Sequence, residues 1–107
     1  LFYITLSEHH DRTVIYTDGS KSNETVSYAV TLVDRIICTS ILPEFSSVFT
    51  AEIIALYKAI KYCQGTGKLA ICTDSLYSIH AILSIINNNL YAVNIRNSLI
   101  KISPKLL

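Results

Sequence analysis

The sequence lacks several features that would assign it to other classes of protein. It contains no methionine and no tryptophan, and charged residues make up only 16% of its 107 residues. Hydrophobic residues make up 50%, so the chain is expected to be globular and not disordered. No apolar run reaches the roughly 18 residues that a membrane span needs, so no membrane partner is expected. Because even position 1 is not methionine, we expect a fragment or a segment of a longer polypeptide.

The net charge and the cysteines further limit the kinds of protein that this sequence can encode. The net charge of +1 argues against a strongly basic nucleic-acid clamp. Lys58, Lys61 and Lys68 form either a local basic ridge or a solvated helix face. The three cysteines lack C-x-x-C spacing and lie in apolar stretches, as reduced core thiols of an intracellular protein do, whether nuclear or cytoplasmic. The opening residues, LFYITLSEHH, lack the basic leader of a secretion signal.

Three strand-like segments come first, after an irregular lead-in expected over residues 1–12. The segments 13–18, 25–33 and 36–42 are short and are separated by short turns. In 25–33, TVSYAVTLV, apolar and polar residues alternate with the period of two that a half-buried strand shows. Turns this short favour antiparallel neighbours. We therefore expect a three-stranded antiparallel meander at the start of a partial domain that covers residues 13–107.

Helices and a further strand are expected in the second half of the chain. The segment 48–63 has no helix breaker and is expected to be a helix closed by QGTG. A strand at 69–73 and helices at 75–86 and about 92–102 follow. The connection between the strands 13–18 and 69–73 passes through a helix, so these two strands can be parallel neighbours. The expected fold class is α/β, with a mixed sheet, an antiparallel meander plus a parallel strand, and helices packed on it.

Three acids stand where this arrangement would gather them. Asp18, in TVIYTDGSKS, and Asp74, in ICTDS, are each expected at the C-terminal end of a strand, and neighbouring strands lie about 4.8 Å apart. Glu52 lies about one turn inside the first helix, among apolar residues, where an acid costs stability unless something binds it. Each acid also has a structural interpretation. Asp-Gly is ordinary turn chemistry, Asp and Ser before a helix are caps, and helix glutamates are usually exposed.

Metal-assisted hydrolysis is the chemistry that such a trio suits. Three converging carboxylates would raise one another's pKa unless a cation were present. Hard oxygen ligands suit Mg²⁺ or Mn²⁺, and two such ions about 3.5–4 Å apart can activate a water and stabilise the leaving oxygen of a phosphodiester. Gly19 would let a substrate backbone approach, because it has no Cβ. Asp18, Glu52 and Asp74 are therefore the predicted catalytic residues and the predicted ligands of two ions.

The motifs around these acids resemble those of a known family. YTDGS, FTAEIIALYKAI and ICTDSLYSI, in this order and spacing, are similar to the motifs of the type 1 ribonuclease H family. The stretch LPEFSSVFTAEIIALYKAI is most similar to ribonuclease H domains of retrotransposon polyproteins, which follow a reverse transcriptase. The resemblance implies an endonuclease that hydrolyses the RNA strand of RNA–DNA hybrids with two divalent ions. By this resemblance, Asp18, Glu52 and Asp74 match three of the four metal-binding acids, and Gly19 and Ser20 match a turn that borders the RNA strand.

The sequence departs from the family at its end. The family continues with a fifth strand, a loop that bears a histidine, and a last helix near whose start the fourth acid lies. Here no Asp or Glu follows Asp74, so the expected domain is C-terminally truncated and lacks the last strand and helix. His80 is expected to be an ordinary helix residue, and His9 and His10 part of the lead-in. Val48 stands where some members place an asparagine that touches the substrate.

Such a truncation would have physical consequences. A missing fifth strand would leave the strand at 69–73 with an unpaired edge, and a missing helix would uncover one face of the sheet. We therefore expect the chain to be marginally stable and inactive or weakly active. Two other interpretations stay open. One is a relic or non-catalytic nucleic-acid-binding module, and the other is a sugar-kinase or actin-like ATPase, which would need a second phosphate-binding turn for which this chain is too short.

Overall fold

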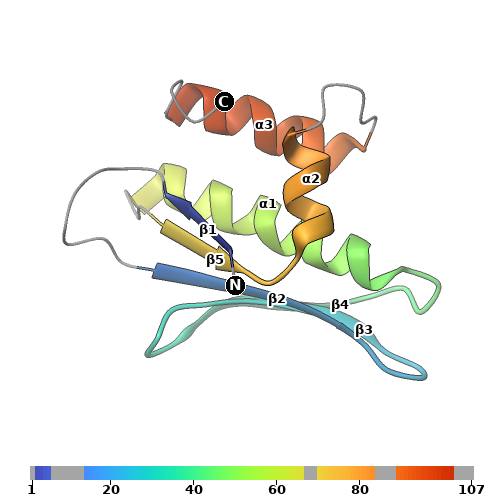
Figure 1. Cartoon of the computed structure of the whole chain (residues 1–107). Coiled ribbons are helices and arrows are strands. Elements are labelled where there is room, and N and C mark those ends of the chain that lie inside the picture. Colours follow the sequence, from blue (N-terminus) through green and yellow to red (C-terminus); the bar gives the residue numbers. More distant parts are fainter. Residues whose placement is uncertain (1, 6–13, 67–69, 84–88, 103–107) are drawn as a thin grey trace.

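The computed structural model describes residues 2–5, 14–66, 70–83 and 89–102. In this part of the chain, strands in the order β1-β5-β2-β3-β4 form one five-stranded mixed sheet, and helices pack on it (Figure 1). None of the described helices is long and apolar enough to cross a membrane. The elements are β1 (Phe2–Thr5), β2 (Val14–Lys21), β3 (Val26–Thr31), β4 (Ile36–Leu42), α1 (Val48–Thr66), β5 (Ala70–Thr73), α2 (Leu76–Leu83) and α3 (Leu90–Ile102).

The strands β2, β3 and β4 form the predicted antiparallel meander, which confirms that prediction. β3 shows the predicted alternation, because Val26, Tyr28 and Val30 are buried and the residues between them are half-buried. β2 and β3 are joined by a turn in which the backbone N–H of Ser22 donates to the carbonyl of Thr25 at 2.8 Å. The period-two pattern therefore reports which side of the meander faces the core.

β5 lies beside β2 and runs parallel to it, as predicted for strands that are joined through a helix. α1 makes this crossover and covers one face of the sheet, and α3 packs on α1 (Figure 1). The core lies between α1 and the sheet and continues between the helices. Burial of each large apolar side chain there contributes roughly 1.5–3 kcal/mol to stability. Its fully buried members include Ile15, Val26, Val30, Ile53, Leu56, Ile60, Ile71 and Ile95.

β1 corrects the prediction that residues 1–12 are irregular. Phe2–Thr5 forms a strand that pairs antiparallel with β5, with Phe2 opposite Thr73 and Thr5 opposite Ala70. The edge of β5 that was expected to be unpaired is therefore paired, by the N-terminal strand. The rest of the lead-in, including His9 and His10, lies outside the described residues.

Several element boundaries also differ from the predictions, and the ends of β2 and α1 differ most. β2 continues through Asp18 and Gly19 to Lys21, and Gly19 pairs with Tyr28 of β3. The predicted Asp-Gly turn is therefore wrong: pairing with β3 outweighs the local turn preference of that dipeptide, and the chain turns after Ser22. α1 continues to Thr66, beyond the predicted end at 63, so QGTG does not close the helix where expected.

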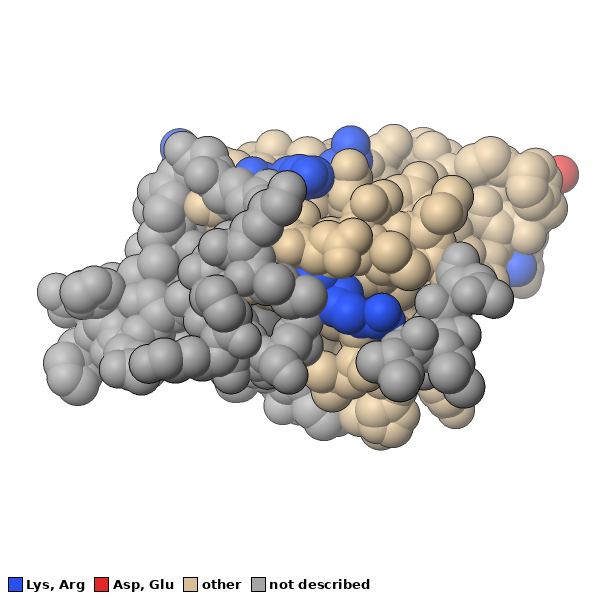
Figure 2. Space-filling view, turned by 90° about the horizontal axis from the view of Figure 1, so that it is seen from above, with Lys and Arg blue, Asp and Glu red and all other residues tan. Residues whose placement is uncertain are grey.

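The cysteines and lysines fall mostly where the sequence suggested. All three cysteines are free, and Cys63 and Cys72 are buried, whereas Cys38 is half-buried against the core. Burial raises the pKa of the Cys63 thiol to about 11, so this thiol is unreactive at neutral pH. Lys58 and Lys61 are exposed on α1, and Lys68 lies outside the described residues. Figure 2 shows the helix-covered side of the molecule, where basic side chains are visible over a broad area.

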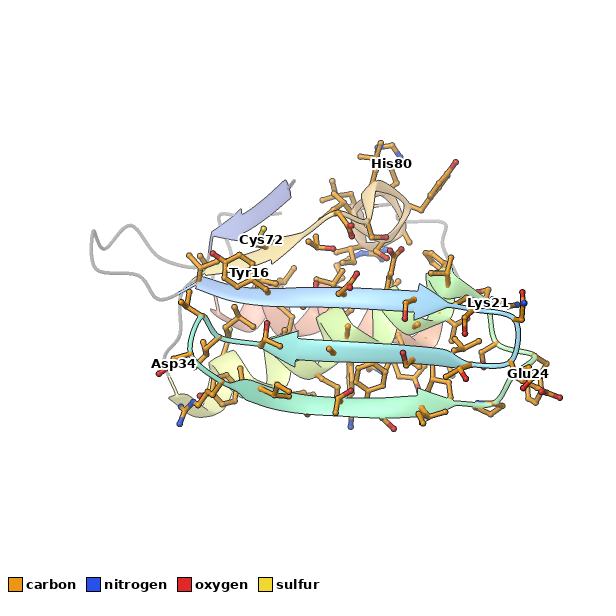
Figure 3. All side chains as sticks on the ribbon, turned by 90° about the horizontal axis from the view of Figure 1, so that it is seen from below. Tyr16, Lys21, Glu24, Asp34, Cys72 and His80 are labelled. Carbon is orange, nitrogen blue, oxygen red and sulfur yellow. The ribbon has the colours of Figure 1, made fainter. Side chains whose placement is uncertain are left out.

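β4 presents an open edge. It pairs with β3 on one side, and no other described strand pairs with it. Its seven residues, IICTSIL, include no charged residue and no proline, and Ile36 and Ile41 are 65% and 74% exposed. In Figure 3 the meander is seen from the side that carries no described helix, with β4 at its margin. Uncharged edges of this kind pair readily with other chains, so we expect self-association through β4.

Replacing Ile41 by lysine should reduce this self-association, because the added charge would have to lose water when a second edge pairs. In sedimentation velocity over about a tenfold range of concentration, the wild-type mass should rise while the variant keeps the monomer mass. Val33→Lys is the matched control, since Val33 is 87% exposed and precedes β4. An equal loss of association in both variants would indicate general charge repulsion and contradict pairing through β4.

Candidate metal and catalytic site

Asp18 lies within β2, next to the parallel strand β5. It pairs with Ala29 of β3 and is exposed, whereas its neighbour Thr17 is buried. The Thr17 hydroxyl donates to the carbonyl of Cys72 at 3.4 Å and so links β2 to β5 immediately before Asp18. Asp18 thus presents a carboxylate to solvent from a strand that is held on both sides.

Asp74 follows the last residue of β5. The pairs Val14–Ala70 and Tyr16–Cys72 share one parallel register, and the same register extended by two residues sets Asp74 beside Asp18. Neighbouring strands lie about 4.8 Å apart. The expectation that both aspartates leave one region of the sheet therefore follows from the observed pairing.

Glu52 is brought to this region by the start of α1. Ser47 caps the helix, because its hydroxyl accepts a hydrogen bond from the backbone N–H of Thr50 at 3.1 Å. A Cβ added at Gly19 would lie 2.7 Å from both Cγ and the backbone nitrogen of Glu52. The absence of a side chain at Gly19 therefore lets the first turns of α1 rest directly on β2, with Glu52 at the contact.

The charges of the two aspartates act on the carboxyl of Glu52. Burial raises the pKa of the Glu52 carboxyl, and the charges of Asp74 and Asp18 raise it further. A hydrogen bond from the side chain of Ser75 acts in the opposite direction and lowers it. Glu52 is half-buried, while Asp18 and Asp74 are exposed. The fold thus brings together three carboxylates that come from β2, α1 and the end of β5.

The three carboxylates have the chemistry of a divalent metal site, but their side chains are not arranged around one metal position. Carboxylate oxygens are the ligands that Mg²⁺ and Mn²⁺ prefer. Burial raises the pKa of Glu52 most, and a cation would offset the further increase that the charges of Asp74 and Asp18 cause. In the described ranges, however, no group of three or more His, Cys, Asp or Glu side chains is arranged so that it could hold a metal ion.

Ser75 is a site residue that the sequence analysis considered only as a helix cap. That role is present: the backbone N–H of Ser78 donates to the Ser75 hydroxyl at 3.2 Å, at the start of α2. The backbone N–H of Ser75 also donates to the Thr73 hydroxyl at 3.1 Å, which turns the chain out of β5. Ser75 is only 4% exposed and its hydroxyl also reaches Glu52, so one residue links the start of α2 to the acids. The sequence feature that could have identified Ser75 as a site residue is the Asp-Ser pair directly after a strand.

The structure also gives the positions of three other residues that the sequence analysis named. Ser20 is exposed on β2, with its hydroxyl 3.1 Å from that of Ser27. Val48 is the first residue of α1 and is 42% exposed. His80 is exposed on α2, as expected for an ordinary helix residue, and Figure 3 shows it on the side of the sheet that lies beyond β5.

Comparisons with known proteins identify the family of the chain and relate its fold to a solved structure. The family model described as RNase H matches residues 10–103. No curated protein matches the chain. Among solved structures, the fold is similar to the crystal structure of RNase H1 from the halophilic archaeon Halobacterium salinarum NRC-1, with a TM-score of 0.58 and 17% sequence identity over 86% of this chain and 80% of that one. This chain belongs to the ribonuclease H family.

Proposed function

We propose that this chain cleaves the RNA strand of RNA–DNA hybrids, with two divalent ions held by Asp18, Glu52 and Asp74. Membership of the ribonuclease H family supports ribonuclease H activity in general. The observation that carries the proposal is the position of Glu52 against Gly19 of β2, where burial raises the pKa of its carboxyl and the charges of Asp74 and Asp18 raise it further. Carboxylates from three elements then share one region that a cation can neutralise.

The residues of the site have distinct roles in this proposal. Asp18 and Asp74 offer exposed carboxylates that can reach a metal and a substrate together. Glu52 contributes its carboxylate from the start of α1, and the Ser75 side chain lowers the pKa of this carboxyl. When bound, Mg²⁺ or Mn²⁺ supplies an activated water and neutralises charge on the phosphodiester. The exposed Ser20 hydroxyl can donate a hydrogen bond to the RNA strand.

Gly19 remains a proposed substrate contact, but its geometry adds another role. Its missing side chain faces Glu52, so it sets the spacing between β2 and α1. The backbone of the same segment can still lie against a nucleic-acid strand, because the next residue, Ser20, is small and exposed.

We further propose that the chain derives from a reverse transcriptase polyprotein of a retrotransposon and that it is weakly active by itself. The motif LPEFSSVFTAEIIALYKAI supports the origin. The lack of any Asp or Glu after Asp74 supports the weak activity, since a fourth carboxylate would have to come from elsewhere.

The proposal is tested by incubating the purified chain with a hybrid whose RNA strand is labelled, in Mg²⁺ or Mn²⁺. Slow cleavage of the hybrid, with single-stranded RNA and RNA duplex left intact, is the expected result, and Asp18→Asn should remove it. Cleavage that persists at the same rate in Asp18→Asn would contradict a site at Asp18. Binding of the hybrid without any cleavage would instead favour a non-catalytic nucleic-acid-binding module.

Metal binding is measured separately, by NMR during titration with Mg²⁺. The resonances of Asp18, Glu52 and Asp74 should shift together along one binding curve at millimolar ion. Three unrelated curves would show that the acids do not form one site. This measurement does not depend on turnover, so it remains informative when activity is low.

A further inference from the structure

Basic and acidic residues are distributed unevenly along the chain. Residues 53–107 contain six lysine or arginine residues and one acid, Asp74, whereas residues 1–52 contain three basic and seven acidic residues. The net charge of +1 therefore conceals an acidic first half and a basic second half. The second half supplies most of the helices, and Figure 2 shows that basic side chains predominate on the helix-covered side, with acidic atoms visible only at its margin. Such asymmetry is typical of proteins that bind polyanions.

Three cations gather at the second half of α1, two from the helix itself and one from the first half of the chain. Lys58 and Lys61 are exposed on it. Arg35, from the turn between β3 and β4, approaches the same helix, where its Nη2 donates to the hydroxyl of Tyr62 at 3.3 Å. Burial raises the pKa of the Cys38 thiol on β4, and the charge of Lys58 offsets part of that shift, so Lys58 lies on the β4 side of the helix.

Tyrosine rings of α1 and α3 contact one another and one of these lysines. The Lys61 ammonium lies 5.5 Å from the centre of the Tyr57 ring, within the range of a cation–π interaction. Tyr57 in turn meets Tyr91 of α3 edge to face, with ring centres 5.4 Å apart. We name these six residues the basic–tyrosine surface: Arg35, Tyr57, Lys58, Lys61, Tyr62 and Tyr91.

Two cations of the basic–tyrosine surface, Arg35 and Lys61, contact tyrosines. Within the described ranges, Arg35, Lys58 and Lys61 form no ion pair with a carboxylate. Asp34, the acid next to Arg35 in the chain, is exposed and leaves a net positive charge on the surface. An ordinary solvated helix face would show lysines interspersed with acids at helical spacing. No acid follows Glu52 in α1, so the charge of this face is uncompensated.

We propose that the basic–tyrosine surface binds the phosphate backbone of a nucleic acid. Lysines and arginine supply charge for the phosphates, tyrosine hydroxyls can donate to phosphate oxygens, and exposed ring surface can stack on bases. Lys61 lies nine residues after Glu52, which places it about 180° around the helix from that acid. The surface is therefore separate from the acids, and it would hold a second segment of nucleic acid, not the strand that is cleaved.

The test measures binding of a labelled DNA duplex of about 20 base pairs by fluorescence anisotropy, since a duplex without RNA is not the proposed substrate. Lys58→Glu with Lys61→Glu should weaken binding at least about tenfold. It should also lower the slope of log affinity against log salt by about 1.8, because each lost phosphate contact removes about 0.9. Lys61→Arg should bind as the wild type does. Lys58 and Lys61 are exposed, so their replacement should not disturb the core. Thermal melts should confirm that all variants fold.

Lys21→Glu is the matched control for the single variant Lys61→Glu. Lys21 carries the same charge and is exposed, and Figure 3 shows it at the end of β2 opposite to the end of the meander that bears Asp34. Equal losses of affinity in the two single variants would overturn the proposal, because net charge alone would explain them. Hybrid cleavage is measured on the RNA-containing hybrid, whereas this surface is measured on the DNA duplex. Failure of hybrid cleavage and failure of this surface are thus observed in different assays.

Discussion

Replacing Gly19 by alanine should destabilise the protein by roughly 2–3 kcal/mol and lower hybrid cleavage about a hundredfold. The new Cβ would lie 2.7 Å from the backbone nitrogen of Glu52 and 3.0 Å from the carbonyl carbon of Ala51. Backbone atoms cannot move aside as the end of a flexible side chain does, so the first turns of α1 must shift away from β2. Glu52 would shift with them and lose its place beside the aspartates.

Urea unfolding measures the change in the free energy of unfolding, and the hybrid assay measures the change in the cleavage rate. Ser20→Ala is the control for stability, because Ser20 is on the same strand but exposed and should change the free energy of unfolding by about 0.5 kcal/mol or less. If Gly19→Ala unfolds at the same urea concentration as the wild type, the contact between α1 and β2 does not require glycine, and the account of how Glu52 is positioned is wrong.

Replacing Glu52 by glutamine should have opposite effects on stability and on activity. Burial and the neighbouring charges raise the pKa of Glu52 above its ordinary value, so the folded protein binds this proton more tightly than the unfolded chain does. The stabilising effect of the proton is present at low pH and is lost as pH rises through the raised pKa. At neutral pH and without metal, the charged Glu52 destabilises the fold, and Glu52→Gln should melt at a higher temperature than the wild type.

The difference in melting temperature should shrink toward about pH 4, where the glutamate is protonated in both states. Cleavage by Glu52→Gln should fall about a thousandfold, as expected when a ligand worth several kcal/mol of charge stabilisation is lost. Mg²⁺ should raise the melting temperature of the wild type more than that of the variant. Glu24→Gln, at the exposed turn between β2 and β3, is the control. If Glu52→Gln is no more stable than the wild type at pH 7, burial and the neighbouring charges do not raise the pKa of Glu52, and this account is wrong.

Much of the fold follows from local patterns. The alternation in TVSYAVTLV predicted β3 and its buried side, and 36–42 was predicted with the boundaries that β4 has. A helix between 13–18 and 69–73 implied parallel strands, and their parallel pairing brings Asp18 and Asp74 to the same region. These predictions succeed because side-chain alternation and helical crossovers depend on backbone geometry, which any sequence with that pattern shares.

The features that were missed depend on contacts between distant residues. Phe2–Thr5 consists of residues common in strands, but four residues show no clear period, and the partner strand β5 comes far later in the chain. The Asp-Gly dipeptide signals a turn, yet the ladder with β3 continues through it. At Ser75 the sequence predicts the cap, whereas its hydrogen bond to Glu52 depends on how α1 lies over β2. Roles that are set by packing cannot be read from one segment.

The place of β1 in the sheet also constrains how the protein is made. A ribosome releases Phe2–Thr5 before Ala70–Thr73, so these residues cannot pair until Ala70–Thr73 has emerged and α1 has brought it back beside β2. Closure of that edge is therefore a late, long-range event in folding, and such events are slow. A fluorescent probe attached near Phe2 would report the final step by which a newly made chain completes its sheet.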